Sequence, residues 1–157
     1  MNAFMNIGLA TMIALIVAMP VLADEQTIID RWNEDRTQVF EAGEITIPEL
    51  QWQARALVIF ADTPNDPRFR QQMDLLIAGV DDLAERDVII ITDTDPSVLS
   101  PLRRVLRPRG YMLALLAKDG RVAQRKPEAV TVRELSRSID KMPLRQQEVF
   151  DRRFIEQ

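Results

Sequence analysis

The chain has 157 residues, a formal net charge of −4 and neither cysteine nor histidine. These absences exclude Cys and His nucleophiles, His general bases and zinc sites built from Cys or His. The length suggests one domain with a targeting segment or tail. The acidic balance carries no sign of nucleic-acid binding.

The first 23 residues carry no charged side chain, and Ile7 to Leu22 is an almost unbroken apolar run. This run is shorter than the roughly 20 apolar residues of a membrane-spanning helix. Val21 and Ala23 suit a signal peptidase that cleaves between Ala23 and Asp24. We therefore expect a signal peptide over 1–23 and a periplasmic or secreted mature chain without a membrane span. The alternative is an uncleaved N-terminal anchor.

The next segment, 24–49, is predicted to be an N-terminal arm that precedes a domain over 50–157. Its apolar residues over 24–40 recur on one face, which predicts an amphipathic helix or ordered arm. A short extended piece is expected at 44–48. The apolar residues of that face are Ile28, Ile29, Trp32, Val39 and Phe40.

The domain begins with a buried strand over 56–61, because "ALVIFA" is a continuous apolar run of strand length. A helix follows, with Asp66 as its cap and Pro67 in its first position. Apolar residues at three-to-four spacing carry this helix to about Arg86.

The middle of the domain predicts three further strands. The β-branched run 88–91 is the second, and a short helix over 97–106 follows it. The third strand spans 111–117, and a tight Asp-Gly turn at 118–120 leads into the fourth, 121–125. The fourth strand is polar and alternating, so we place it at an edge of the sheet.

The C-terminal part predicts two helices. Thr131 and Glu134 form the capping box of a helix over 131–142, Pro143 ends it, and a last helix spans 144–155. The order is β-α-β-α-β-β-α, in which crossover helices make the first strands parallel and the hairpin makes the last pair antiparallel. We expect a mixed four-stranded sheet flanked by helices, an α/β architecture of the thioredoxin-like type.

Two stretches carry a resemblance to thioredoxins. "LLAKDGRV" (115–122) resembles their third-strand hairpin, and "VIFADTPNDPRF" (58–69) has the shape of their redox elbow. On this alignment Pro64 and Pro67 take the two cysteine positions, and Met112 takes that of the facing cis-proline. Thiol–disulfide exchange needs a thiolate, so this activity and thiol-based peroxidase activity are excluded.

Five further segments resemble domain-of-unknown-function family 4174. The resemblance implies a thioredoxin- or peroxiredoxin-like domain, found in small exported bacterial proteins and in secreted sushi-repeat animal proteins. No activity is established for the family, so it supplies no functional residues. The segments are "W..R.LVIFA" from Trp52, "DPRF..Q" from Asp66, "LAERDVIIIT" from Leu83, "KDGRV" from Lys118 and "IDKMPLRQQE" from Ile139.

Acidic residues follow two of the predicted parallel strands. Asp62 comes after the first, and Asp93 and Asp95 come after the second. Ligands of open α/β sheets bind at the carboxyl ends of strands, and oxygen ligands suit Ca²⁺ or Mg²⁺. The three carboxylates are therefore a candidate metal site. The plainer alternative is that Asp is common at strand ends and helix caps.

Arginines suggest a partner-binding surface. Arg103, Arg104, Arg107 and Arg109 form a basic cluster that suits an acidic partner or a phosphate, although such runs are more often a solvated helix face. Arg145 lies in the segment between the last two helices, as part of a recognition surface or as support for the last helix through Glu148.

These patterns predict an exported, non-catalytic, thioredoxin-like module of the cell envelope that binds a protein or peptide and needs no cofactor. The alternative is a carboxylate- or metal-dependent enzyme that uses Asp62, Asp93 and Asp95. A purely structural envelope protein is a weaker third possibility. The sequence does not indicate an oligomeric state.

Overall fold

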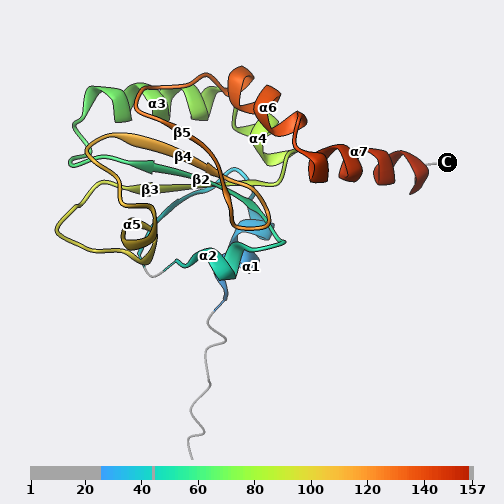
Figure 1. Ribbon diagram of the computed structural model, residues 1–157, viewed down its shortest axis with the longest axis horizontal. Coiled ribbons are helices and arrows are strands. Elements are labelled where there is room, and N and C mark those ends of the chain that lie inside the picture. The colour runs from blue at the N-terminus through green and yellow to red at the C-terminus, as the bar shows by residue number, and fades with distance from the viewer. Residues whose placement is uncertain (1–25, 44, 156–157) are drawn as a thin grey trace, which may run out of the picture.

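The computed structural model describes residues 26–43 and 45–155. Helices and strands alternate along most of this length (Figure 1). The elements are α1 (Ile28–Glu34), β1 (Val39–Glu41), α2 (Ile47–Leu50), β2 (Arg55–Phe60), α3 (Pro67–Ala78), α4 (Val80–Ala84), β3 (Val88–Asp93), α5 (Pro101–Leu106), β4 (Met112–Leu116), β5 (Val122–Lys126), α6 (Val132–Asp140) and α7 (Pro143–Ile155).

The strands form one mixed sheet in the order β1-β3-β2-β4-β5. β3 is parallel to both β1 and β2, while β4 is antiparallel to β2 and to β5. β2 lies at the centre, with Val58 opposite Ile91 on one side and Ala114 on the other. This confirms the predicted thioredoxin-like arrangement, with five strands in place of four.

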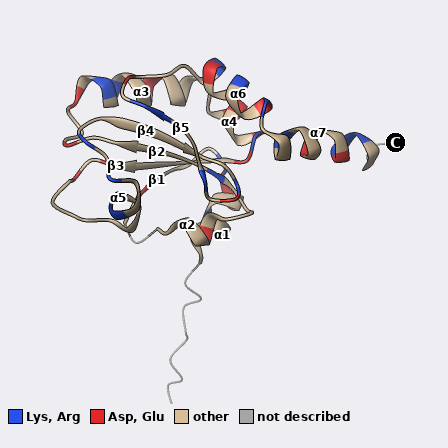
Figure 2. Ribbon diagram, viewed as in Figure 1, with Lys and Arg blue, Asp and Glu red and all other residues tan. Residues whose placement is uncertain are grey.

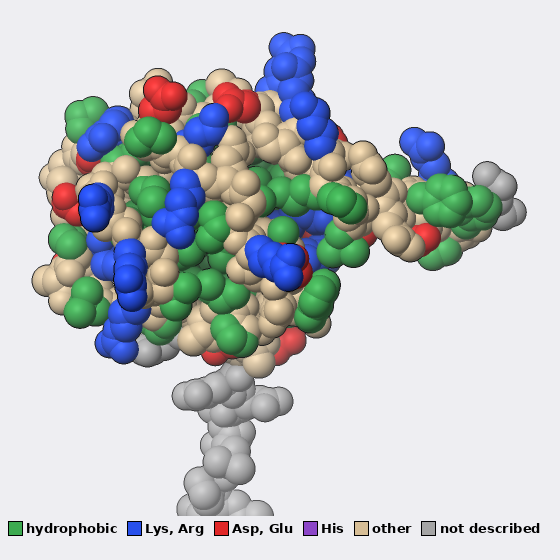
Figure 3. Space-filling model, viewed as in Figure 1, with side chains coloured by type: hydrophobic (Ala, Val, Ile, Leu, Met, Phe, Trp, Pro, Cys, Tyr) green, Lys and Arg blue, Asp and Glu red, His purple; other side chains and the backbone are tan. Residues whose placement is uncertain are grey.

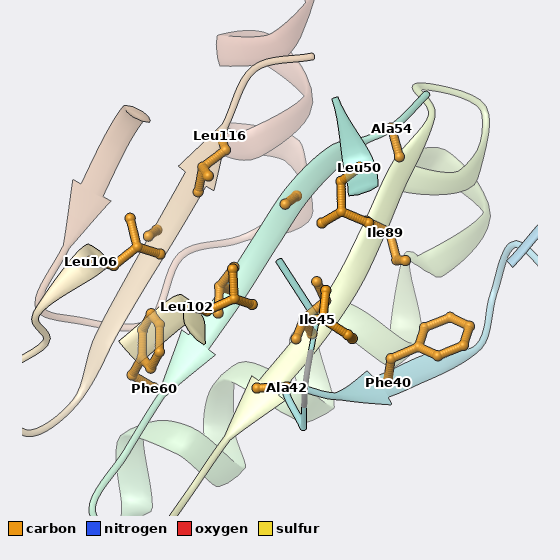
Figure 4. Packing of buried hydrophobic residues seen from close by; sticks show 14 of the residues in the cluster. Phe40, Ala42, Ile45, Leu50, Ala54, Phe60, Ile89, Leu102, Leu106 and Leu116 are labelled. Carbon is orange, nitrogen blue, oxygen red and sulfur yellow. The ribbon is translucent and has the colours of Figure 1, made fainter. Parts of the chain in front are cut away.

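Helices cover both faces of the sheet (Figure 1). α3, α4 and α6 lie over one face, and α1, α2 and α5 lie over the other. Every residue of β2 is buried, because alternate side chains enter the two separate cores. Figure 4 shows the core under α2 and α5, where Phe60, Leu102 and Leu106 pack together on one side and Phe40 and Ile89 on the other.

The expected N-terminal arm is part of this fold. Its helix ends at Glu34, and Val39 and Phe40 lie in β1, which is the strand that the sequence analysis missed. Trp32 and Phe40 are buried in the core. β1 has only three residues, too few for an alternating pattern to be distinguished from a helical one.

Two predicted helices differ in their bounds. The helix expected to run to about Arg86 divides into α3 and α4 at Gly79, whose backbone leaves the helical conformation with φ −132°. Gly79 also packs against Val132 of α6, where an added Cβ would lie 3.0 Å from that side chain. The helix expected from Ser97 begins at Pro101, with Ser100 as its cap. The piece expected to be extended at 44–48 leads instead into α2 at Ile47, and Glu44 lies outside the described residues.

Several local predictions are confirmed. Asp66 caps α3 by accepting a hydrogen bond from the Arg68 amide, and β5 lies at the edge of the sheet. The predicted capping box is wrong in part: the Thr131 hydroxyl accepts from the Glu134 amide, but the Glu134 carboxylate pairs with Lys126 and does not complete the box. α7 begins at Pro143 and projects away from the sheet (Figure 1).

The predicted signal peptide, 1–23, and its cleavage point at Ala23 and Asp24 lie outside the described residues. Among the residues that the structure describes, none of the helices has the length and apolar character needed to cross a membrane.

Candidate functional site

The elbow between β2 and α3 is an exposed loop that its own hydrogen bonds hold in place. The Asp66 carboxylate accepts from the Arg68 amide at 2.8 Å and from the Arg68 guanidinium at 2.9 Å. These bonds hold the pKa of Asp66 below its usual value. Thr63 accepts from the Asn65 amide. Pro64 is exposed, and Met112 begins β4 opposite Phe60, so the elbow has the expected shape without a thiol.

Directly inside the elbow, Arg103 of α5 closes the carboxyl ends of β2 and β3. Its Nη2 lies 2.6 Å from Asp93 Oδ1 and 3.2 Å from the Ala61 carbonyl oxygen, and its Nε lies 3.0 Å from Asp93 Oδ1. The Ser100 hydroxyl donates to the other Asp93 oxygen at 2.6 Å. All these groups are buried, and the guanidinium also lies 5.4 Å from the centre of the Phe60 ring.

The three carboxylates of the candidate metal site do not form a ligand set. Asp93 is occupied by Arg103 and Ser100, as described above. Asp95 is exposed and accepts bonds from the Ser97 amide and hydroxyl, while Asp62 is exposed on the elbow. Within residues 26–43 and 45–155 no group of three or more acidic side chains has the geometry to hold a metal ion. The ion pair with Arg103 and the bond from Ser100 use the oxygens of Asp93, and the bonds from Ser97 use an oxygen of Asp95.

Of the five arginines predicted to bind a partner, two are buried and three are exposed. Arg103 belongs to the interior, and Arg145 is buried on α7. The exposed ones are Arg104 on α5, Arg107 at its C-cap and Arg109 just beyond it. The structure therefore brings only part of the predicted set together at the surface.

Exposed apolar side chains accompany these arginines. Val98, Leu99 and Val105 have exposed fractions of 58%, 59% and 62%. Figure 3 shows basic side chains among hydrophobic ones over the part of the molecule where α5 lies, and Figure 2 shows the basic positions along α5. We call this mixed surface the α5 surface; it comprises Val98, Leu99, Arg104, Val105, Arg107 and Arg109.

A hollow of about 360 Å³ adjoins the α5 surface. Its walls come from the carboxyl ends of β1 and β3 and from the loop that leads to α5. Val98 belongs to both the hollow and the α5 surface. The hollow is lined by Glu41, Ala42, Gly43, Thr92, Asp93, Thr94, Asp95, Val98 and Ser100.

A second polar site, which the sequence analysis did not find, lies at the amino ends of β2 and β3. Lys118 Nζ lies 2.8 Å from both Asp87 Oδ2 and Glu148 Oε1. The Arg55 side chain is 1% exposed, and its Nη2 donates to Glu148 at 3.2 Å. We call this the basal cluster; it comprises Arg36, Arg55, Arg86, Asp87, Lys118, Asp140, Arg145 and Glu148.

Charges in the basal cluster shift two carboxyl groups. Burial raises the pKa of Asp87, but the hydrogen bonds and charges of Lys118 and Arg36 outweigh this effect and hold it below its usual value. The hydrogen bond from Arg86 lowers the pKa of Asp140. Four of the five segments that resemble the family supply residues to the cluster. A second sequence signal is Arg55, a charged residue that begins an otherwise apolar strand.

We predict that breaking the Arg103–Asp93 pair destabilises the fold more than any neighbouring surface change. Arg103→Met leaves Asp93 buried and unpaired, which costs about 3–5 kcal/mol in the free energy of unfolding. Urea unfolding followed by tryptophan fluorescence measures the loss. Arg104→Met, one residue along on the exposed face, is the control and changes stability by less than about 0.5 kcal/mol. Equal losses in the two variants would contradict the arrangement described here.

We also predict a high ionisation midpoint for Tyr111, the single tyrosine of the chain. Its hydroxyl donates to buried Gln72 at 3.2 Å, and burial raises its pKa from 10.0 to about 12, although Arg68 opposes this shift. The fold favours the neutral phenol, so this contribution to stability is complete below pH 10 and is lost as the pH rises toward 12. Absorbance at 295 nm reports the ionisation, with the urea-unfolded chain as reference; a native midpoint near that of the unfolded chain would refute the prediction.

Comparisons with known proteins concern the fold and the family. The solution structure of reduced desulfothioredoxin from Desulfovibrio vulgaris Hildenborough is similar, with a TM-score of 0.47, 19% identity, and coverage of 63% of this chain and 91% of that one. No curated protein matches the chain. The family model described as "Domain of unknown function (DUF4174)" matches residues 46–148, so the chain belongs to the DUF4174 family.

Proposed function

We propose that the protein is an exported, non-catalytic binding protein of the cell envelope that holds an acidic segment of a protein or peptide on its α5 surface. The observation that carries this proposal is the exposed group of three arginines and three apolar side chains beside a closed elbow. The chain as a whole has a net charge of −4, so the positive charge of this surface is opposite in sign to the net charge of the protein.

The lack of catalysis by thiols follows from the residues of the chain. Disulfide exchange requires a thiolate, and the sequence contains no cysteine. The position inside the elbow, where an open α/β sheet would admit a ligand, is filled by Arg103 and Asp93. A ligand of this end of the sheet therefore contacts the outside of α5 and the adjoining hollow.

Charge and shape both favour an acidic partner with apolar side chains. Arg104, Arg107 and Arg109 offer guanidinium groups that bind carboxylates with two parallel hydrogen bonds. Val98, Leu99 and Val105 offer apolar area that loses contact with water on binding. The hollow beside Val98 has room for a neutral or basic side chain of the partner, because Glu41 and Asp95 line it. Because the arginines are exposed, the interaction should weaken as salt concentration rises.

The proposed location rests on the N-terminal segment. Its uncharged, apolar run and the small residue at Ala23 fit a cleaved signal peptide. A fold of this size without disulfides is compatible with the periplasm, because its two cores do not depend on cysteine.

We predict that reversing the charge of the α5 surface abolishes partner binding. The double variant Arg104→Glu/Arg107→Glu is compared with wild type by cross-linking in intact envelopes, followed by mass spectrometry of the cross-linked segments. The expected result is a discrete partner whose cross-linked segment is rich in Asp and Glu and which the variant loses. The matched control is Arg133→Glu/Arg137→Glu, which reverses two exposed charges on α6.

Three outcomes would reject the proposal. Loss of the same adduct in the α6 control would show that overall charge decides. Cross-links that map to α6 or α7, with none on α5, would place the partner elsewhere. A captured segment without acidic residues would remove the argument from charge complementarity.

A further inference from the structure

A groove of about 920 Å³ lies between α1 and α2, which are neighbours on one face of the sheet (Figure 1). It uses none of the residues of the α5 surface or the basal cluster. Its apolar part comes from Ile45, which is buried, and from Ile28 and Ile29, which are half-buried against the same core. Exposed polar side chains of both helices and of the segment after α2 border this apolar part. Apolar surface with a few placed polar groups is the usual composition of a ligand site.

Three amide side chains supply much of the polar lining, and each of them is exposed. Gln26 donates through its Nε2 atom to Glu34 at 2.8 Å, which leaves its oxygen as an acceptor. Asn33 accepts from Arg36 through its Oδ1 atom at 3.4 Å, which leaves its nitrogen as a donor. Gln53, which follows α2, is the third. The groove therefore offers both donors and acceptors to a ligand.

The charged side chains of the groove favour an uncharged ligand. They are Asp30, Arg31 and Glu49. Asp30 accepts from the Thr27 hydroxyl at 2.6 Å, and Glu49 accepts from the Thr46 amide at 3.0 Å, so part of their hydrogen-bonding capacity is used within the chain. Two carboxylates against one guanidinium oppose an anion. One unit of excess negative charge at an exposed surface attracts a cation only weakly.

Trp52, which precedes Gln53 at the end of α2, is an exposed aromatic residue with a strained backbone. Its side chain is 63% exposed, and its φ of 66° lies in the left-handed region that bulky residues rarely adopt. Its amide donates to the Lys118 carbonyl at 2.6 Å, which fixes the backbone there. A mostly exposed indole adds little to the packing of the core, so packing does not account for a strained residue at this position. Such strain is concentrated at functional sites, and a rigidly held aromatic side chain binds a ligand with little loss of entropy.

We propose that the groove between α1 and α2 binds a neutral glycan, with Trp52 as a stacking face and the amides of Gln53 and Asn33 as hydrogen-bonding groups. A pyranose ring has apolar C–H faces and a rim of hydroxyl groups that both donate and accept. The C–H faces suit the indole and the side chains of Ile28 and Ile29, while the hydroxyls suit the amides. The volume of the groove lies within the range of about 300–1,000 Å³ that is usual for small-molecule sites. The proposal does not depend on the function proposed for the α5 surface.

The test uses the full chain, with the β-linked hexamers of N-acetylglucosamine and of glucose as probes in titration calorimetry. We expect saturable binding of at least one hexamer, with an affinity that changes little with salt because the ligand carries no charge. Trp52→Gly should weaken this binding at least tenfold and should keep the fold, because glycine adopts the left-handed conformation without steric cost. Phe150→Ala, which removes an exposed aromatic residue of α7, is the control and should bind as wild type.

A second pair of variants tests the amides of the groove. Gln53→Ala should weaken binding at least threefold, whereas Gln71→Ala, which removes an exposed glutamine of α3, should leave the affinity unchanged. Fluorescence of the wild type covers the case in which Trp52→Gly does not fold. The chain has two tryptophans, and Trp32 is 1% exposed, so iodide quenches mainly Trp52. The bound hexamer should reduce this quenching.

Several results would overturn the proposal. They are a lack of saturable binding of both hexamers, wild-type affinity in Trp52→Gly, unchanged iodide quenching at saturation, and tighter binding of the anionic hexamer of galacturonate. Protein cross-links to α1 or α2 in intact envelopes would assign the groove to a protein partner instead. The charge-reversed variant Arg104→Glu/Arg107→Glu should bind the hexamers as wild type, so failure of the glycan site and failure of the α5 surface are distinguishable.

Discussion

The buried ion pair between Arg103 and Asp93 is the interaction on which the arrangement of the elbow depends. Removing two charges from water is costly, and their attraction offsets that cost only when the remaining hydrogen bonds are completed. Ser100 supplies the second oxygen of Asp93 with a donor, and the Ala61 carbonyl accepts from Arg103. The pair therefore fixes α5 against the ends of β2 and β3, and it fills the position at which this kind of sheet admits ligands.

The two ends of the sheet consequently offer different chemistry. At the carboxyl end, charges are buried in the pair and the remaining arginines face solvent together with apolar side chains. At the amino end, Glu148 of α7 pairs with Arg55 and Lys118, and these ion pairs join α7 to the sheet. The first end suits a macromolecular partner that covers an exposed surface, whereas the charges of the second are largely paired with one another.

Predictions from the sequence succeeded where local patterns decide the structure. The continuous apolar run of β2 and the caps at Asp66 and Thr131 depend only on neighbouring residues, so the sequence predicts them. β1 was missed because three residues carry no period, and the close contact between Gly79 and Val132 joins residues that are distant in sequence. The burial and partners of charged side chains were the features that the sequence predicted least well. Arg103 and Arg104 are adjacent and chemically identical, yet the helix turns one inward to Asp93 and the other to solvent.

The most direct test of this account is the hydrogen exchange of the Arg103 Nε–H group, measured by NMR in the native protein at neutral pH. That hydrogen is donated to Asp93 at 3.0 Å and is buried, so its resonance should be visible and should exchange with solvent far more slowly than that of exposed Arg104. Exchange of Arg103 as fast as that of Arg104 would mean that the guanidinium reaches water. The closure of the elbow by the ion pair would then be wrong.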